Sequence, residues 1–195
     1  ENDGPDTSGN LMITRGQIEG LDPRFFVKDS KGDEYFLKFD PMDNLEMATA
    51  AEIIASRFYY AFGYNVPQYT LATFEPSKLV PGEGTKVYDD TGFKKKLMQQ
   101  ELDEFLVFIP QDANGHLRVS ASKVLAGETK GGFSYSGRRR NDPQDPVKHQ
   151  ARREIRGLRL FSAWLNNFDM RESNTVDVVT AENGQTTLKH YLTDF

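Results

Sequence analysis

The residues best suited to chemistry in this sequence are two aspartates and an asparagine near its C-terminal end. Asp169 and Asn174 share a polar loop, and Asp194 follows a run of apolar residues. Phosphoryl transfer needs a carboxylate that orients the acceptor hydroxyl, plus an amide oxygen and a second carboxylate that hold Mg²⁺ against the phosphates. The spacing lets Asp169 face the acceptor while Asn174 folds back to the metal. The alternative is that Asp169 caps a turn, Asn174 satisfies loop backbone and Asp194 lies on the surface.

A lysine and a glutamate in the N-terminal half complete this set. Lys38 lies in a predicted strand, on the face that Phe36 also occupies, and a lysine in such surroundings needs an anion. Glu52 lies in the middle of a predicted helix, away from the helix start where the dipole would explain a carboxylate. We therefore predict a buried pair between Lys38 and Glu52. The alternative is that Lys38 lies on an edge strand and extends its amine to water.

Hydrophobic periodicity predicts the elements that must position these residues. In the N-terminal half we expect an antiparallel meander and then an amphipathic helix that Gly63 follows. Its apolar face consists of Ala48, Ala51, Ile54, Ala55, Phe58 and Phe62. In the C-terminal half we expect a helix with a broad buried face that includes Leu160 and Trp164, followed by a hairpin. The predicted strands are 11–18, 25–28, 34–39, 68–74, 105–109, 116–125, 176–180 and 188–195; the helices are 45–62 and 148–166; the loops are 81–92 and 127–146.

Composition excludes several classes of protein. The chain has 195 residues, of which 37% are hydrophobic and 12% aromatic, enough for a packed core. Its net charge of −5 argues against a surface that binds nucleic acid or anionic lipid as a whole. It has no Cys, so a disulfide framework and a thiolate nucleophile are excluded, and no apolar run approaches the ~18 residues of a membrane span. We expect a soluble protein, with the cytoplasm and the bacterial envelope both left open.

Basic residues are concentrated between positions 138 and 159. Arginines here could hold an acidic or phosphorylated partner, and the alternative is an ordinary solvated helix face. The candidates are Arg138, Arg152, Arg156 and Arg159.

The order of these residues resembles that of the protein-kinase-like superfamily, and more closely its atypical branch of HipA-type and phosphoinositide-type kinases. Residues 51–67 look like the HipA-type helix that carries the pairing glutamate and ends in Gly before a Val-Pro strand. Segments 36–40, 137–143, 152–157 and 163–166 look like those of an uncharacterised bacterial kinase-like group. The resemblance covers residues 11–195.

The resemblance implies an α+β, two-lobed fold in which an N-terminal lobe of antiparallel sheet plus one helix binds ATP. Residues 1–10 would be a flexible segment, 11–110 the N-terminal lobe, 111–146 the hinge-side strands and loop, and 147–195 the start of a C-terminal lobe that is incomplete in this chain.

The resemblance also implies roles for the site residues. Lys38 would contact the α- and β-phosphates and Glu52 would hold Lys38. Asp169 would be the catalytic aspartate, and Asn174 and Asp194 would bind Mg²⁺. A glycine-rich phosphate loop is represented by Gly16 and Gly20 alone, and Asn167-Phe168 replaces the usual His-Arg before the catalytic aspartate.

The function expected from the sequence is therefore an ATP- and Mg²⁺-dependent phosphotransferase whose acceptor the sequence does not name. Two alternatives use the same residues: a pseudokinase or nucleotide-binding interaction module, and a transferase that moves AMP.

Overall fold

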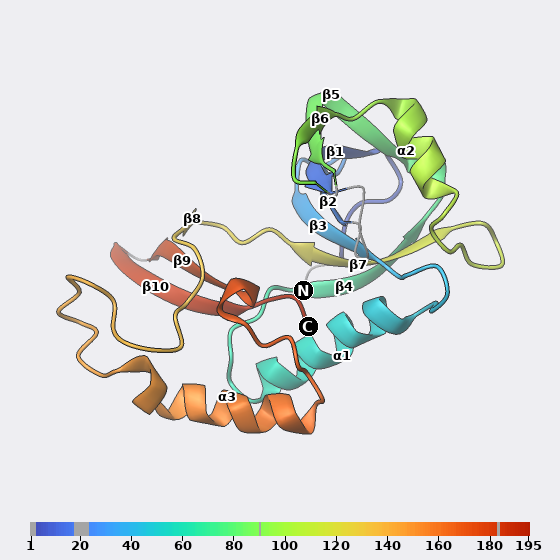
Figure 1. The fold of residues 1–195 in the computed structure, drawn as a ribbon. Helices are drawn as coiled ribbons and strands as arrows, with labels where there is room; N and C mark the ends of the chain where they lie inside the picture. The colour runs from blue at the N-terminus through green and yellow to red at the C-terminus, as the bar shows by residue number, and fades with distance from the viewer. Residues whose placement is uncertain (1–2, 18–23, 90, 183) are drawn as a thin grey trace. The chain divides into compact units, whose positions relative to one another are not determined.

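We describe a computed structural model of the chain that covers residues 3–17, 24–89, 91–182 and 184–195 (Figure 1). The candidate Gly20 lies outside these residues. The chain divides into two compact units. Unit 1 comprises residues 1–54 and 68–124, and unit 2 comprises residues 55–67 and 125–195. The division falls within helix α1. The sequence-based ranges for the lobes stay a prediction.

The elements follow one another in the order β-β-β-α-β predicted for the opening segment. The strands are β1 (Leu11–Gln17), β2 (Arg24–Lys28), β3 (Glu34–Phe39), β4 (Tyr69–Phe74), β5 (Leu79–Tyr88), β6 (Lys94–Lys96), β7 (Leu117–Lys123), β8 (Glu128–Thr129), β9 (Thr175–Glu182) and β10 (Gln185–Leu192). The helices are α1 (Met47–Ala61), α2 (Gln99–Leu106) and α3 (Arg153–Trp164). The fold class is therefore α+β, as expected.

Unit 1 is built on a 7-stranded sheet with the order β4-β7-β3-β2-β1-β5-β6. The predicted meander is confirmed, because β1, β2 and β3 pair antiparallel in sequence. Strand β3 lies inside the sheet, between β2 and β7. Lys38 is therefore not on an edge strand, and that alternative is wrong.

One face of this sheet carries the core of unit 1. Alternation along β3 sends Tyr35, Leu37 and Phe39 to this face, where all three are buried. Helix α2 lies over the same face, and Leu102 and Leu106 join the cluster. Phe36 and Lys38 consequently lie on the other face.

Two predictions in the middle of unit 1 are wrong. The segment 81–92 was predicted to be a loop, yet β5 covers residues 81–88 of it and pairs parallel with β1. The segment 105–109 was expected to be a strand, but Phe105 and Leu106 end helix α2. Short apolar runs of this kind have no periodicity that separates a strand from a helix, and long-range pairing decided both cases.

Helix α1 forms where predicted, and Gly63 adopts the left-handed conformation, with φ of 91°, that ends many helices. The predicted buried face is right only in part: Ala55 and Phe62 pack against a core cluster that includes Tyr59, whereas Ala51, Ile54 and Phe58 are exposed. The buried residues of α1 instead form a largely polar stripe: Thr49, Glu52, Ser56 and Tyr59.

Unit 2 contains a 3-stranded sheet with the order β10-β9-β8, and helix α3. The predicted hairpin is confirmed by the antiparallel pairing of β9 and β10, and Gly184 has φ of 75°. The predicted loop 127–146 contains one short strand, β8, which pairs with β9. The core of the unit is a cluster around Tyr59, Leu158 and Leu192.

The second predicted helix is confirmed in its position and in part of its buried face. Ile155, Leu158 and Ser162 of α3 are buried. Leu160 and Trp164 are exposed, so the broad buried face predicted for this helix is wrong. No helix in the described part of the chain combines the length and apolar character that crossing a bilayer demands.

The packing of the unit 1 sheet gives a test of this core. Replacing Leu37, fully buried on β3, by Ala should lower the free energy of unfolding by about 2–5 kcal/mol, because it removes methyl groups and leaves a cavity. The matched control is Leu71→Ala on β4, where the side chain is 49% exposed and the loss should be under about 1 kcal/mol. Urea denaturation monitored by circular dichroism measures both, and equal losses would contradict the assignment of the core face.

Candidate functional site

The first group of candidate residues is a buried ion pair in unit 1. Lys38 Nζ lies 2.7 Å from Glu52 Oε1, and the two residues are only 8% and 1% exposed. The predicted pairing is confirmed. A buried ion pair contributes little net stability, because both charges lose hydration, and it is therefore a candidate for a functional role.

A second polar contact fixes the start of α1 beside this pair. The Asp40 carboxylate accepts hydrogen bonds from the Thr49 backbone N–H at 2.8 Å and the Thr49 hydroxyl at 2.9 Å, and both residues are buried. These contacts join the residue after β3 to the first turn of the helix that carries Glu52. They restrict the positions that the Glu52 carboxylate can take relative to Lys38.

A cavity of about 410 Å³ opens in unit 1 on the Lys38 face of the sheet. Arg24 is opposite Lys38 and Phe26 is opposite Phe36 in the β2–β3 register, which places these side chains on one face. Arg15 extends over the Phe26 ring, with its guanidinium carbon 3.8 Å from the ring centroid. The lining residues are Arg15, Gly16, Gln17, Arg24, Phe26, Phe36 and Tyr88.

Gly16 has a steric reason to be glycine in this cavity wall. A Cβ at this position would lie 2.5 Å from the Arg24 carbonyl oxygen and 2.5 Å from the Phe25 ring. Strand β2 therefore approaches too closely for any side chain. Gly16 lines the cavity, as the predicted nucleotide site requires, while its phosphate-binding role stays a prediction.

The second group of candidate residues lies in unit 2, where Asn174 joins the other two. Its side-chain Nδ2 donates to the Asp169 carboxylate at 2.9 Å, to the Asp169 carbonyl at 2.8 Å and to the Asp194 carbonyl at 3.4 Å. The predicted convergence of Asp169, Asn174 and Asp194 is confirmed. All three partners of Nδ2 are acceptors, and the Asn174 amide oxygen accepts from the Ser173 hydroxyl at 3.3 Å. An amide oxygen has two lone pairs, so this atom can still bind a cation.

The backbone at Asp194 is held in an unusual conformation. Asp194 has φ of 61°, in the left-handed region that few residues other than glycine adopt. Phe195, the next residue, stacks on Tyr59 at 5.1 Å between ring centroids. Tyr59 is fully buried and its hydroxyl lies 2.9 Å from Ser162 Oγ, so this stacking ties the end of β10 to α1 and α3. Strain of this kind is found at functional sites.

One residue of the site was missed in the sequence. The Arg171 guanidinium forms an ion pair with Asp169 Oδ1, so both carboxylate oxygens of Asp169 have partners. Arg171 is largely exposed, and its guanidinium can also meet an anion arriving beside Asp169. Arg171 could have been identified from the sequence, because it follows Asp169 by two residues within the same polar loop.

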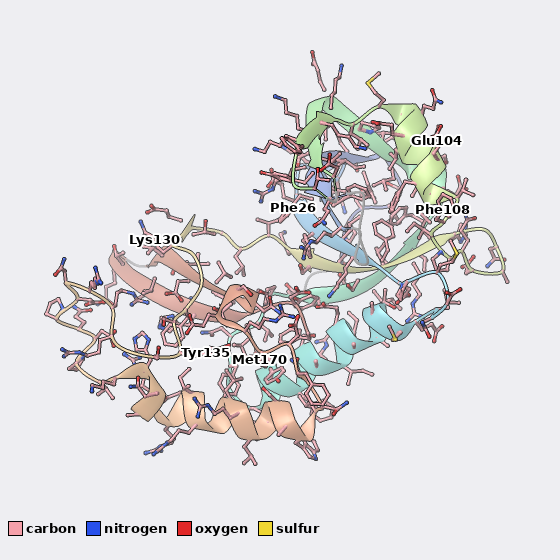
Figure 2. The ribbon with its side chains drawn as sticks, in the orientation of Figure 1. Phe26, Glu104, Phe108, Lys130, Tyr135 and Met170 are labelled. Carbon is pink, nitrogen blue, oxygen red and sulfur yellow. The ribbon has the colours of Figure 1, made fainter. Side chains whose placement is uncertain are left out.

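A groove of about 330 Å³ lies beside this loop in unit 2. Figure 2 labels two of its residues, Tyr135 and Met170, which lie close together in this unit. Its walls are mainly apolar and include Ile155, Leu158 and Phe168, with Arg159 as the charged member. An acceptor bound here would lie along residues that flank Asp169.

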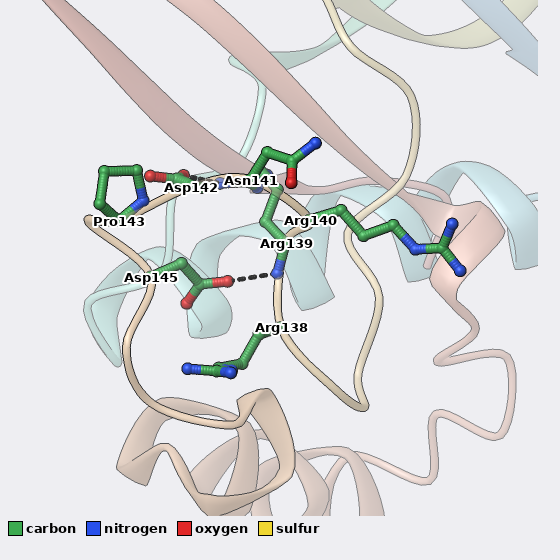
Figure 3. Close-up of a pocket in the computed structure, with 7 residues that line it drawn as sticks. All are labelled: Arg138, Arg139, Arg140, Asn141, Asp142, Pro143 and Asp145. Carbon is green, nitrogen blue, oxygen red and sulfur yellow. Dashed lines mark hydrogen bonds and ion pairs between the residues drawn. The ribbon is translucent and has the colours of Figure 1, made fainter.

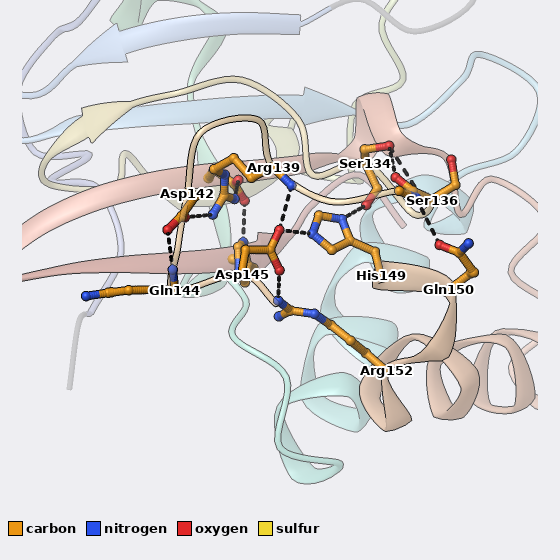
Figure 4. Close-up of polar contacts among 12 residues, drawn as sticks. Ser134, Ser136, Arg139, Asp142, Gln144, Asp145, His149, Gln150 and Arg152 are labelled. Atoms are coloured by element: carbon orange, nitrogen blue, oxygen red, sulfur yellow. Dashed lines mark hydrogen bonds and ion pairs between the residues drawn. The ribbon is translucent and has the colours of Figure 1, made fainter. Parts of the chain in front are cut away.

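The arginine-rich segment of unit 2 forms a pinned loop. Asp145 is 3% exposed and accepts from the Arg139 backbone N–H at 2.6 Å and the His149 ring at 2.7 Å (Figure 4). It also forms an ion pair with Arg152. The other ring nitrogen of His149 lies 2.5 Å from the Ser134 carbonyl.

These contacts correct the predicted partner surface. Arg152 precedes α3 and is paired with Asp145, so it does not share an open stripe with Arg156 and Arg159 on the helix. Arg156 and Arg159 are exposed on α3, and Arg138 is exposed in the loop. The four arginines therefore differ: Arg152 is in an ion pair, whereas the other three are exposed.

The buried Lys38–Glu52 pair gives a stability prediction. Glu52→Gln should lower the free energy of unfolding by about 3–5 kcal/mol, because it leaves the Lys38 charge buried without its counter-charge. The control is the double variant Lys38→Met with Glu52→Leu, which removes both charges and should be clearly more stable than Glu52→Gln. Chemical denaturation measures the stability of both variants. If the double variant is no more stable than Glu52→Gln, the loss in Glu52→Gln does not come from an unpaired Lys38 charge.

The Asp145 contacts give a pH prediction. The Arg139 N–H first, and then His149 and Arg152, hold the pKa of the Asp145 carboxyl well below its usual range. A carboxyl whose pKa falls on folding stabilises the protein above its unfolded pKa of about 4, and this contribution is lost as the pH falls further.

Asp145→Asn should therefore reduce the free energy of unfolding at pH 7, where the wild-type carboxylate is ionised. The difference from the wild-type protein should shrink below about pH 4. Asp43→Asn, at an exposed position, is the control and should change little at any pH. A difference that stays constant down to about pH 3 would show that the Asp145 contacts do not favour the ionised form.

Within the described residues, no three His, Cys, Asp or Glu side chains come together as a metal site. The comparisons with known proteins give no further guide. No family model, no curated protein and no solved structure matches this chain. The kinase-like resemblance stays a prediction, and the function has to be inferred from the chain's own side chains.

Proposed function

We propose that this chain is an ATP- and Mg²⁺-dependent phosphotransferase of the atypical, two-lobed kinase-like type. The single observation that carries the proposal is the buried ion pair between Lys38 of β3 and Glu52 of α1, at 2.7 Å. An ion pair buried in this way fixes a lysine amine inside the protein, and a fixed amine suits the phosphates of a nucleotide.

The cavity on the Lys38 face of the sheet supports nucleotide binding by unit 1, although Lys38 itself is not among its lining residues. Its volume of about 410 Å³ is in the range of small-molecule sites, and it combines two arginines with three aromatic rings. Arginine suits phosphate oxygens, and the aromatic rings offer apolar area to a base. Gly16 belongs to the same wall.

Asn174 and Asp194 fit the Mg²⁺ that the proposal requires. The Asn174 amide oxygen and the Asp194 carboxylate are hard oxygen donors of the kind that Mg²⁺ prefers. The Asn174 amide nitrogen is engaged with acceptors, and the amide oxygen has a second lone pair for the cation beside its hydrogen bond from the Ser173 hydroxyl. When bound, the ion would neutralise charge on the phosphates.

Asp169 is the residue proposed to orient the acceptor hydroxyl. Its carboxylate is held by Asn174 and Arg171, which fixes its direction. For Asp169 to accept a hydrogen bond from the acceptor, Arg171 must release one oxygen. An incoming phosphoryl group offers Arg171 a replacement anion.

The same contacts favour a second candidate, a nucleotide-binding module without turnover. If Arg171 stays on Asp169, the carboxylate is not available to the acceptor. Such a protein would keep the Lys38–Glu52 pair and the cavity, and would bind Mg²⁺-ATP without transferring its phosphate.

Asp169→Ala separates the two candidates. In the wild-type chain incubated with Mg²⁺-ATP, we expect autophosphorylation or release of phosphate. Asp169→Ala should lower that rate by about 10²–10⁴-fold while leaving the affinity for Mg²⁺-ATP within about twofold. Isothermal titration calorimetry measures the affinity, and radiolabelled γ-phosphate measures the transfer.

The control is Asp43→Ala, an exposed carboxylate outside the proposed site, which should leave both quantities unchanged. Binding without turnover in the wild-type chain would support the nucleotide-binding module. Addition of AMP, seen by intact mass spectrometry, would establish an AMP transferase instead. Failure to bind Mg²⁺-ATP at all would refute the proposal.

A further inference from the structure

The arginine loop of unit 2 surrounds a hollow that the proposed phosphotransferase does not use. The hollow has a volume of about 580 Å³ and lies within the segment from Arg138 to Asp145 (Figure 3). Its lining residues are Arg138, Arg139, Arg140, Asn141, Asp142, Pro143 and Asp145.

The loop around this hollow is held by buried charges. Asp145 and His149 are each 3% exposed, and Phe133 stacks on the His149 ring at 4.3 Å between centroids. Both ring nitrogens of His149 have an oxygen neighbour, one in the Asp145 carboxylate and one in the Ser134 carbonyl. Burying the Asp145 charge costs desolvation free energy, and the contacts that compensate for it fix both ends of the arginine loop.

The carboxylates near the hollow are already paired with cations. Asp145 meets His149 and Arg152. Asp177 and Asp142 both meet Arg139, at 2.6 and 3.5 Å. Arg139 is therefore the neutralised member of the three consecutive arginines.

The other two arginines are left to meet an external anion. Arg138 and Arg140 are exposed, and neither forms an ion pair with any residue that the structure describes. Figure 3 draws the Arg138 side chain inside the loop and the Arg140 side chain extending from its other side. Exposed side chains change rotamer within nanoseconds, so both guanidinium groups can turn to one ligand in the hollow. The result is a local positive charge in a chain whose net charge is −5.

From these observations we infer that the Arg138–Arg140 loop binds a phosphoserine or phosphothreonine segment of a partner protein. Guanidinium groups hold phosphate oxygens through paired hydrogen bonds, and arginine clusters recognise phosphorylated peptides. Pro143 is the one apolar side chain in the lining, so the walls do not suit a nucleobase or a lipid chain. This inference is independent of the proposed phosphotransferase function.

Fluorescence anisotropy with the full chain tests the site. The probe is a labelled peptide of alanine and glycine with one central phosphoserine, and the reference is the same peptide with serine. We expect the phosphopeptide to bind at least about tenfold more tightly than the serine peptide. The double variant Arg138→Gln with Arg140→Gln should remove about tenfold or more of that affinity.

The matched control is Arg153→Gln with Arg156→Gln, which removes the same charge from exposed positions of α3 outside the groove beside Asp169. This variant should bind the phosphopeptide as the wild-type chain does. A third variant, Arg138→Lys with Arg140→Lys, keeps the charge but loses the paired geometry and should bind with intermediate affinity. It also serves if the glutamine variant proves misfolded by circular dichroism.

Three results would overturn the inference. The first is equal affinity for the phosphoserine and serine peptides. The second is an equal loss of affinity in the α3 control, which would show general electrostatic attraction in place of a site. The third is displacement of the peptide by an equimolar amount of inorganic phosphate, which would identify a free-phosphate site. Loss of Mg²⁺-ATP turnover in an Asp169 variant would leave all of these measurements unchanged.

Discussion

The burial of the Lys38 charge is the constraint on which the arrangement of unit 1 depends. Alternation along β3 puts the Lys38 side chain on the sheet face opposite the apolar core, where it is almost fully enclosed. An enclosed ammonium group must have a counter-charge, and Glu52 of α1 supplies it. The helix is therefore oriented by its polar residues, with Asp40 and Thr49 holding its start. This explains why the buried stripe of α1 is largely polar while Ile54 and Phe58 remain exposed.

Unit 2 has a comparable fixed point in Tyr59. Its ring stacks on Phe195 and its hydroxyl contacts Ser162, so the second half of α1, helix α3 and the end of β10 meet around one buried side chain. Asn174 then joins Asp169 to the Asp194 backbone. The candidate catalytic residues of this unit are thus positioned by a short set of direct contacts, which is the rigidity that a reactive constellation requires.

In the arginine loop, too, buried contacts hold in place the residues that could bind a ligand. The buried Asp145 and His149, together with the half-buried Arg152, hold a loop in which Arg138 and Arg140 are exposed. The charged network adds little net stability, since each buried ion loses its hydration. A loop that is fixed in this way keeps Arg138 and Arg140 within one short turn, and a ligand that needs both of them loses less entropy on binding.

The sequence by itself determined the elements with strong periodicity or turn chemistry: the meander, α1, the start of β4, α3 and the Asn-Gly hairpin. It also determined which residues could pair, because a lysine on a strand and a glutamate in mid-helix each need a partner.

Only the tertiary structure decided the rest. Strand β5 and helix α2 depend on pairing with β1 and on the core of the sheet, which no local pattern encodes. The buried side of α1, the capture of Arg152 by Asp145 and the contact of Arg171 with Asp169 likewise depend on charges from distant segments or on loop geometry. Hydrophobic periodicity measures only the apolar contribution to burial, whereas the burial of a charge is decided by whether its counter-charge is present.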